Sequence, residues 1–259
     1  MLTTGEPEVD ALLPALTVGI TTTLEPQPCL LGLYLYGSLT SGDFTPGVSD
    51  IDLLAVTDGP VTLEVIARLQ PMHAEIETRF PRWQDRIEVI YVPRQALATF
   101  RTQVSEIAAI SPGEPLHILS AGIDWLMNWR QVRHGGQVVT GPPAETYVPD
   151  TTVEEYVTAV REHAAACGDW MPEMRAPRQQ SYAVLTLCRA LYTVRHGHGA
   201  SKAAAAAWLA AEMPHCAPLL EQALRWREVA PTDPTIADRA YPQTLRFVQE
   251  MQAEIARTE

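Results

Sequence analysis

Two aspartates separated by one residue are the groups best placed to do chemistry. Asp50 and Asp52 lie in the segment Ser49-Asp50-Ile51-Asp52-Leu53-Leu54. Successive side chains of a strand point to opposite faces, so both carboxylates would share one face. Two like charges held close together, and partly shielded from water, need a cation or a proton to compensate them. Oxygen ligands suit Mg²⁺, so the sequence predicts a magnesium site at Asp50 and Asp52.

A glycine–serine pair precedes these aspartates, directly after the apolar run Leu33-Tyr34-Leu35-Tyr36. Gly37 would let the backbone approach a ligand without a side chain in the way, and Ser38 adds a hydroxyl donor. Gly-Ser after a strand is usually an ordinary loop. Combined with Ser49 and the two aspartates, it favours a phosphate-binding turn. We therefore assign Gly37, Ser38 and Ser49 to nucleotide binding.

Glu88 is the one acid in the apolar segment 87–92. Such a residue either reaches water from an edge strand or faces a polar partner. Because acids in strands with few other charges are seldom buried alone, we favour the second reading, in which Glu88 is a third carboxylate beside Asp50 and Asp52.

The elements that position these residues follow from apolar periodicity and turn signals. The pattern predicts strands over 29–36, 50–56 and 86–92, with helices over 8–24 and 63–80, although Pro14, Gly19 and three threonines weaken the first helix. After Pro143 the composition changes to helical patterns over 152–168, 179–196, 202–213, 216–229 and 237–257. We therefore expect two domains, residues 1–150 and 151–259.

The chain contains eighteen arginines and a single lysine, Lys202. Ser201 is a predicted N-cap, so Lys202 would stand in the first turn of a helix, where a cation opposes the helix dipole. An anion bound there would reverse that penalty, which indicates a phosphate contact, whereas the alternative is an exposed, screened lysine. Arg189 interrupts an apolar helix and needs either a structural carboxylate or a phosphate as partner.

The combination of Gly37-Ser38 and Ser49-Asp50-Ile51-Asp52 resembles the signature of the polymerase-β-like nucleotidyltransferase superfamily. Further segments resemble the aminoglycoside 3″-adenylyltransferases, which modify streptomycin and spectinomycin. These segments are Leu24-Glu25-Pro26, Leu35-Tyr36-Gly37-Ser38, Gly141-Pro142 and Val184-Leu185-Thr186-Leu187. The resemblance implies an α+β fold, with a nucleotidyltransferase domain built on a mixed sheet flanked by helices and followed by a helical bundle.

The resemblance also implies a reaction and its residues. AMP would pass from ATP to a drug hydroxyl with release of pyrophosphate, giving antibiotic resistance. Asp50, Asp52 and Glu88 would bind Mg²⁺, and Glu88 would also contact the acceptor and take its proton. Lys202 would contact the ATP phosphates, and Arg189 would assist it.

The acceptor side departs from the family pattern. The family's acids before its Val-Leu-Thr-Leu helix correspond here to Gln179 and Gln180. Trp170 resembles the family's drug-binding tryptophan but lies about six residues further from that helix. We assign Trp170, Glu173, Gln179 and Asp124 to acceptor binding. An enzyme acting on another small molecule or a protein, and a non-enzymatic, antitoxin-like nucleotide-binding module, stay open as alternatives.

The charge and the cysteine content indicate which kinds of partner and site to expect. The net charge is −12, and residues 1–150 hold 18 acids and 8 bases. Such a field attracts a cationic acceptor and repels nucleic acid, although an acidic surface also simply aids solubility. Without a signal peptide or an apolar span, we expect a cytoplasmic monomer with no membrane partner. Four scattered cysteines indicate buried reduced thiols rather than a zinc site or disulfides.

Overall fold

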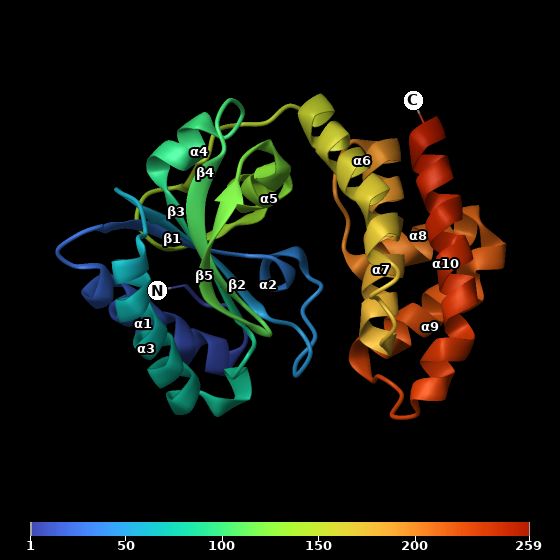
Figure 1. Ribbon diagram of the computed structural model, residues 1–259, viewed down its shortest axis with the longest axis horizontal. Coiled ribbons are helices and arrows are strands. Elements are labelled where there is room, and N and C mark those ends of the chain that lie inside the picture. Colours follow the sequence, from blue (N-terminus) through green and yellow to red (C-terminus); the bar gives the residue numbers. More distant parts are fainter. Residues whose placement is uncertain (1, 259) are drawn as a thin grey trace. The chain divides into compact units, whose positions relative to one another are not determined.

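The computed structural model describes residues 2–258 and divides into two compact units (Figure 1). Unit 1 ends at Thr151, and unit 2 begins at Thr152. Unit 1 holds a six-stranded sheet with its helices, and unit 2 is helical. The predicted α+β fold is therefore confirmed. The elements of unit 1 are α1 (Pro7–Leu24), β1 (Leu30–Tyr36), α2 (Ser38–Ser41), β2 (Ile51–Thr57), α3 (Leu63–Arg79), β3 (Ile87–Pro93), α4 (Arg94–Thr99), β4 (Ser105–Ser111), β5 (Glu114–Ala121), α5 (Leu126–Gly135) and β6 (Gln137–Thr140).

The sheet has the strand order β5-β4-β3-β2-β1-β6. β2 and β3 run parallel, and the other neighbouring pairs are antiparallel. Parallel neighbours need a crossover connection, and α3 supplies it. The mixed sheet thus brings β2 and β3, which carry Asp52 and Glu88, side by side in register.

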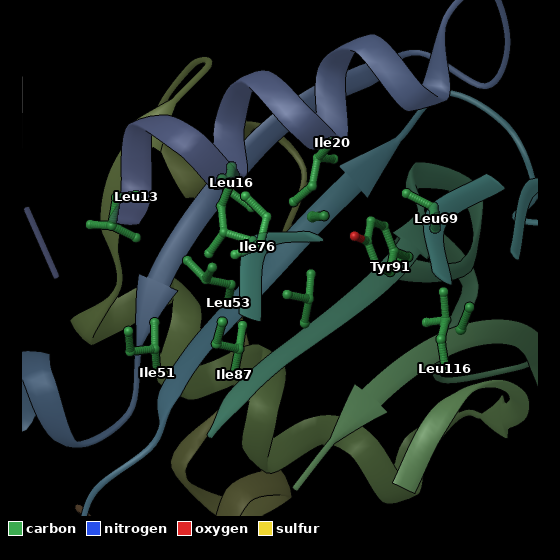
Figure 2. Close-up of a cluster of buried hydrophobic side chains, with 14 of the residues drawn as sticks. Leu13, Leu16, Ile20, Ile51, Leu53, Leu69, Ile76, Ile87, Tyr91 and Leu116 are labelled. Atoms are coloured by element: carbon green, nitrogen blue, oxygen red, sulfur yellow. The ribbon is translucent and has the colours of Figure 1, made fainter. Parts of the chain in front are cut away.

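One face of the sheet packs against α1 and α3 (Figure 2). Alternate residues of β2 and β3 point into this core because side chains alternate along a strand. Their neighbours point to the opposite face, where the acids lie. The core residues labelled in Figure 2 are Leu13, Leu16, Ile20, Ile51, Leu53, Leu69, Ile76, Ile87, Tyr91 and Leu116.

Helix α1 forms despite its poor helix-forming residues. Pro14 lies inside it, but its apolar side chains are buried at Val9, Leu12, Leu13, Leu16, Ile20 and Leu24. Gly19 has a packing role, because a Cβ at this position would lie 2.9 Å from Met72 Sδ on α3. Burial against the sheet and α3 therefore outweighs the weak intrinsic propensity of this segment.

A buried histidine in unit 1 should make the stability of the folded protein depend on pH. His73 Nε2 lies 2.7 Å from Tyr91 Oη, and burial lowers the pKa of His73 to about 4. The unfolded chain therefore binds this proton near pH 6.5 while the folded chain does not, so stability falls as the pH drops from about 6.5 to 4. We expect the loss to reach about 3 kcal/mol.

Urea unfolding between pH 7 and pH 4 tests this expectation. The double variant His73→Leu/Tyr91→Phe removes both polar partners together and should lose the histidine's part of the pH dependence. Parallel stability curves for the wild type and the double variant would show that His73 does not cause the acid loss.

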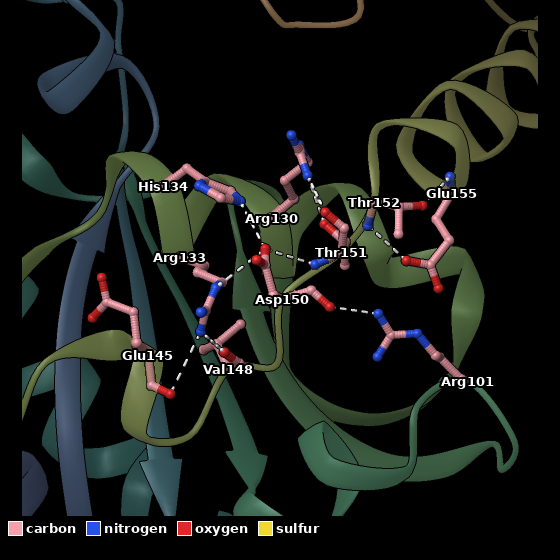
Figure 3. A network of polar contacts seen from close by, with 10 residues as sticks. All are labelled: Arg101, Arg130, Arg133, His134, Glu145, Val148, Asp150, Thr151, Thr152 and Glu155. Carbon is pink, nitrogen blue, oxygen red and sulfur yellow. Dashed lines mark hydrogen bonds and ion pairs between the residues drawn. The ribbon is translucent and has the colours of Figure 1, made fainter.

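The C-terminal end of unit 1 is tied to α5 by a polar network (Figure 3). Asp150 Oδ1 lies 3.4 Å from Arg133 Nε and 3.3 Å from His134 Nε2. A hydrogen bond from the Thr151 backbone, assisted by the positive charge of Arg133, lowers the pKa of Asp150. Arg130 donates to the Thr151 carbonyl at 2.6 Å. The segment that leads out of unit 1 is therefore anchored up to its last residue.

Unit 2 is built around a central helix, α7. It packs against each of the other long helices of the unit. The predicted helices are confirmed, with bounds that differ by at most three residues. They are α6 (Val153–Trp170), α7 (Pro177–His196), α8 (Lys202–Glu212), α9 (Ala217–Glu228) and α10 (Pro234–Arg257). None of the helices in the described part of the chain has the length and apolar character needed to span a bilayer.

Local signals explain where these helices begin. Thr152 and Glu155 form a capping box at the start of α6 (Figure 3). Ser201 accepts a hydrogen bond from the Ala204 N–H and caps α8, as predicted. Lys202 is therefore the first residue of α8. Side-chain caps satisfy backbone donors that the first turn leaves open, so these helix starts are locally encoded.

Candidate active site

Three polar side chains form a row across the sheet. Asp52 on β2 pairs with Tyr36 on β1 and with Glu88 on β3. Direct pairing puts the three residues on one face, opposite the core that α1 and α3 cover. Tyr36 donates to Glu88 Oε1 at 3.3 Å, so the tyrosine hydroxyl reaches the carboxylate of the third strand. The predicted neighbourhood of Asp52 and Glu88 thus follows from the parallel register.

Burial dominates the electrostatics of Glu88. It raises the pKa of Glu88, while hydrogen bonds from Tyr36 and Ser111 lower it and the charge of Asp50 raises it further. Burial likewise raises the pKa of Tyr36 well above its usual value, and the charge of Glu88 adds to this effect. Tyr36 therefore stays protonated and acts as a fixed donor to Glu88. The glutamate is a carboxyl group whose proton affinity is higher than usual, which suits proton transfer.

Asp50 lies one residue before β2, beside Arg86 at the corresponding position before β3. Its Oδ1 is 3.8 Å from Arg86 Nε. Within residues 2–258, Asp50, Asp52 and Glu88 do not form a group whose ligand oxygens all lie within 4.8 Å of one another.

The turn after β1 is built around the Asp52 carboxylate. Gly37 has φ 76° and ψ −142°, a conformation that is essentially restricted to glycine. A Cβ at this position would lie only 1.8 Å from Asp52 Oδ2. We predicted that Gly37 clears space for a ligand, and the space it leaves is occupied by Asp52 itself. The glycine thereby lets the carboxylate lie directly against the turn.

Ser38 begins the short helix α2, and its Oγ is buried without a hydrogen-bond partner among residues 2–258. A buried hydroxyl without a partner costs about 1–3 kcal/mol. Ser49 differs, because its Oγ accepts the Thr45 N–H at 2.9 Å. Ser38 is thus available for a ligand oxygen, whereas Ser49 shapes the loop that leads into Asp50.

In unit 2 the structure links Arg189 to the segment before Lys202. Arg189 Nε donates to the Ala200 carbonyl at 3.0 Å, two residues before Lys202. Among residues 2–258, this carbonyl, rather than a carboxylate, is the structural partner of Arg189. The arginine therefore supports the turn that leads into α8, and it lies in the same part of unit 2 as the start of that helix.

Comparison with known proteins is informative at this point. A family model described as the C-terminal domain of aminoglycoside adenylyltransferase matches residues 148–254, and one described as the nucleotidyltransferase domain matches residues 22–109. The chain belongs to the aminoglycoside adenylyltransferase family. It is accordingly an enzyme that uses the nucleotidyltransferase fold.

The fold of this adenylyltransferase has a counterpart among solved structures. A crystal structure of spectinomycin adenyltransferase AAD(9) from Enterococcus faecialis with ATP and spectinomycin matches it with a TM-score of 0.76 and 16% sequence identity. The match covers 95% of this chain and 99% of that one, so the two proteins share their whole fold. No curated protein sequence matches the chain.

The residues assigned to acceptor binding lie in several places in this adenylyltransferase. Trp170 ends α6 with its ring 5.1 Å from that of His163, and Glu173 is exposed in the following turn. Gln179 accepts the Ala176 N–H at 3.0 Å and so caps α7. In unit 1, Asp124 accepts the Gly122 N–H at 2.8 Å within its own turn. Gln179 and Asp124 thus each have a local structural role.

The sequence patterns did not reveal two residues that contact the acids of the candidate site. Tyr36 holds Glu88, and Arg86 neighbours Asp50. Strand alternation puts Tyr36 on the same face of β1 as Tyr34. Only the register of β1 against β2 shows that Tyr36 lies next to Asp52. Arg86 lies one residue before β3, just as Asp50 lies one residue before β2. With parallel pairing of the two strands assumed, this equivalence would have indicated that the two residues are close.

Proposed function

We propose that this enzyme transfers AMP from ATP to a hydroxyl of an aminocyclitol or aminoglycoside antibiotic, streptomycin or spectinomycin, and releases pyrophosphate. Such a modification would give resistance to the drug. The observation that carries the proposal is the pairing of Asp52 with Glu88 beside the Gly37–Ser38 turn. Family membership supports the reaction class.

The donor chemistry of Asp50, Asp52 and Glu88 suits a magnesium ion. Carboxylate oxygens are the donors that this hard cation prefers, and Gly37 lets Asp52 lie against the turn. Asp50, Asp52 and Glu88 would hold the ion. When bound, it would neutralise charge on the phosphate oxygens and on the attacking and leaving oxygens.

Glu88 has the properties of a general base. Burial raises its pKa, so its carboxylate takes up a proton more readily than an exposed glutamate does. The hydrogen bond from Tyr36 fixes its orientation. In the proposed reaction, Glu88 receives the proton of the drug hydroxyl as that oxygen attacks the α-phosphorus and the bond to pyrophosphate breaks.

Phosphate binding is proposed for residues of both units. The buried Ser38 hydroxyl would donate to a phosphate oxygen, which supplies the partner it lacks in the described part of the chain. Lys202 would add a cation at the first turn of α8, whose N–H groups also favour an anion. Arg189 would bind phosphate or keep the turn before Lys202 in shape. Ser49 would act through the loop that positions Asp50.

The acceptor is proposed to be a cation. Residues 1–150 carry 18 acids and 8 bases, which concentrates small polycations near unit 1. Trp170 and Glu173 would contact the drug most directly. Gln179 caps α7 and Asp124 is hydrogen-bonded within its own turn, an observation that also favours a second candidate, transfer to another small alcohol.

Pyrophosphate release tests the proposal directly. The enzyme, ATP and Mg²⁺ are combined with streptomycin, spectinomycin, other aminoglycosides, neutral alcohols or no acceptor. We expect Mg²⁺-dependent release with streptomycin or spectinomycin, and a drug product heavier by one adenylyl group in mass spectrometry. Release only with a neutral alcohol would support the second candidate, and the absence of release with every acceptor would contradict nucleotidyl transfer.

A further inference from the structure

A cluster of three different ligand groups in unit 2 takes no part in the proposed transfer. His215 and Cys216 close the short helix η4 (Pro214–Cys216), and Glu250 lies on α10. An imidazole nitrogen, the thiol sulfur and a carboxylate oxygen all lie within 4.8 Å of one another. His215 Nε2 is 2.9 Å from Glu250 Oε1.

The distances are close to those of a tetrahedral site. Zn²⁺ binds nitrogen, oxygen and sulfur ligands at about 2.0–2.3 Å, so neighbouring ligand atoms around it stand about 3.5 Å apart. Side chains that are already within 4.8 Å need only small rotations to reach this spacing. The His215 and Glu250 side chains are 61% and 39% exposed, so an ion from solvent can reach them.

Cys216 supplies the inner ligand. It is buried, and burial together with the charge of Glu250 raises the pKa of its thiol to about 11. A divalent cation at this position would offset this rise in the thiol pKa, because it stabilises the thiolate and compensates the carboxylate charge. The thiol proton then passes to solvent as the metal–sulfur bond forms.

We propose that His215, Cys216 and Glu250 bind one zinc-class divalent ion, with water in the fourth position. The mixed nitrogen, sulfur and oxygen donor set suits a borderline-soft ion rather than Mg²⁺. The ion would tie the connection between α8 and α9 to α10 and so stabilise unit 2. The scattered cysteines, which form no C-x-x-C pair, led us to expect no zinc site. The sequence does not reveal this cluster, because Glu250 is 35 residues away from His215.

Cobalt substitution tests the site in the full-length protein. Co²⁺ replaces Zn²⁺, and a thiolate ligand gives it an intense charge-transfer band. We titrate Co²⁺ in excess Mg²⁺, which occupies carboxylate sites elsewhere. The expected result is a thiolate band that saturates at one equivalent and is abolished by Zn²⁺. Cys216→Ser should lose the band, whereas Cys167→Ser, a buried cysteine on α6, should keep it. A wild type without the band, or a Cys216→Ser variant that keeps it, would overturn the proposal.

Thermal unfolding gives a second measurement that needs no thiol substitution. Binding to the folded state should make Zn²⁺ raise the Tm of the wild type and of Cys167→Ser. His215→Gln, a substitution at an exposed position, should remove this rise in Tm. Glu250→Gln should weaken Zn²⁺ binding by at least about 10–100-fold. An equal rise in all four proteins would place the bound zinc elsewhere and overturn the proposal.

Discussion

Gly37→Ala should reduce adenylyl transfer by roughly 10²-fold or more, because a methyl group at this position would overlap the Asp52 carboxylate. The added Cβ would stand 1.8 Å from Asp52 Oδ2, so the carboxylate or the turn must move. The backbone, at φ 76° and ψ −142°, adds strain of about 1–3 kcal/mol. Turnover of ATP and drug, together with urea unfolding, measures the two effects.

Gly42→Ala is the matched control for this substitution. Gly42 also has a positive φ, 73°, but a Cβ there would meet nothing within 4 Å. We expect it to cost about 1 kcal/mol of stability and to leave turnover near the wild-type level. If both variants lost activity equally, backbone strain in this region would explain the loss, and the contact between Gly37 and Asp52 would not.

Glu88→Gln should lower turnover by about 10²–10⁴-fold, since the amide cannot accept the proton of the drug hydroxyl. The same change should stabilise the metal-free protein near neutral pH. Because burial raises the pKa of Glu88, the folded state favours the protonated form, and its stability falls as the pH rises above the unfolded value of 4.5. The substituted amide carries no charge and keeps an oxygen that can accept from Tyr36.

Thermal unfolding in a chelator at pH 4 and pH 8, alongside steady-state turnover, checks both parts. The stability advantage of Glu88→Gln should be small at pH 4 and larger at pH 8. Glu106→Gln, at an exposed position on β4, serves as the control and should change neither quantity. Wild-type turnover in Glu88→Gln would remove the proposed base, and an unchanged pH profile of stability would remove the argument from burial.

The sequence predicted the long helices and the central strands well. Asp52 and Glu88 were assigned to one site from strand alternation and the family resemblance. The parallel register explains why the two acids are neighbours, since residues at equivalent offsets in β2 and β3 pair directly. A local sequence pattern indicates on which face of its strand a side chain lies. It does not indicate which residue of the neighbouring strand lies opposite.

The region between β3 and unit 2 was not assigned to elements from sequence. α5 buries only Leu126, Trp129 and Val132, too few apolar positions to distinguish a helix from a loop. β4 and β5 form a hairpin at the sheet edge whose exposed positions interrupt the apolar pattern. These elements are stabilised by tertiary contacts with the sheet, which a local reading does not include.

The polar core of unit 2 has a consequence for directed evolution of drug specificity. Gln180 donates to the carbonyls of Arg175 and Ala237 and accepts from Thr244 Oγ1 at 2.8 Å. A carboxylate at this position would direct negative charge at two carbonyl oxygens in a buried environment. Gln179, exposed one residue earlier, tolerates an acid without that conflict. A mutant library that seeks to recover a cation contact should therefore randomise position 179 and keep position 180 constant.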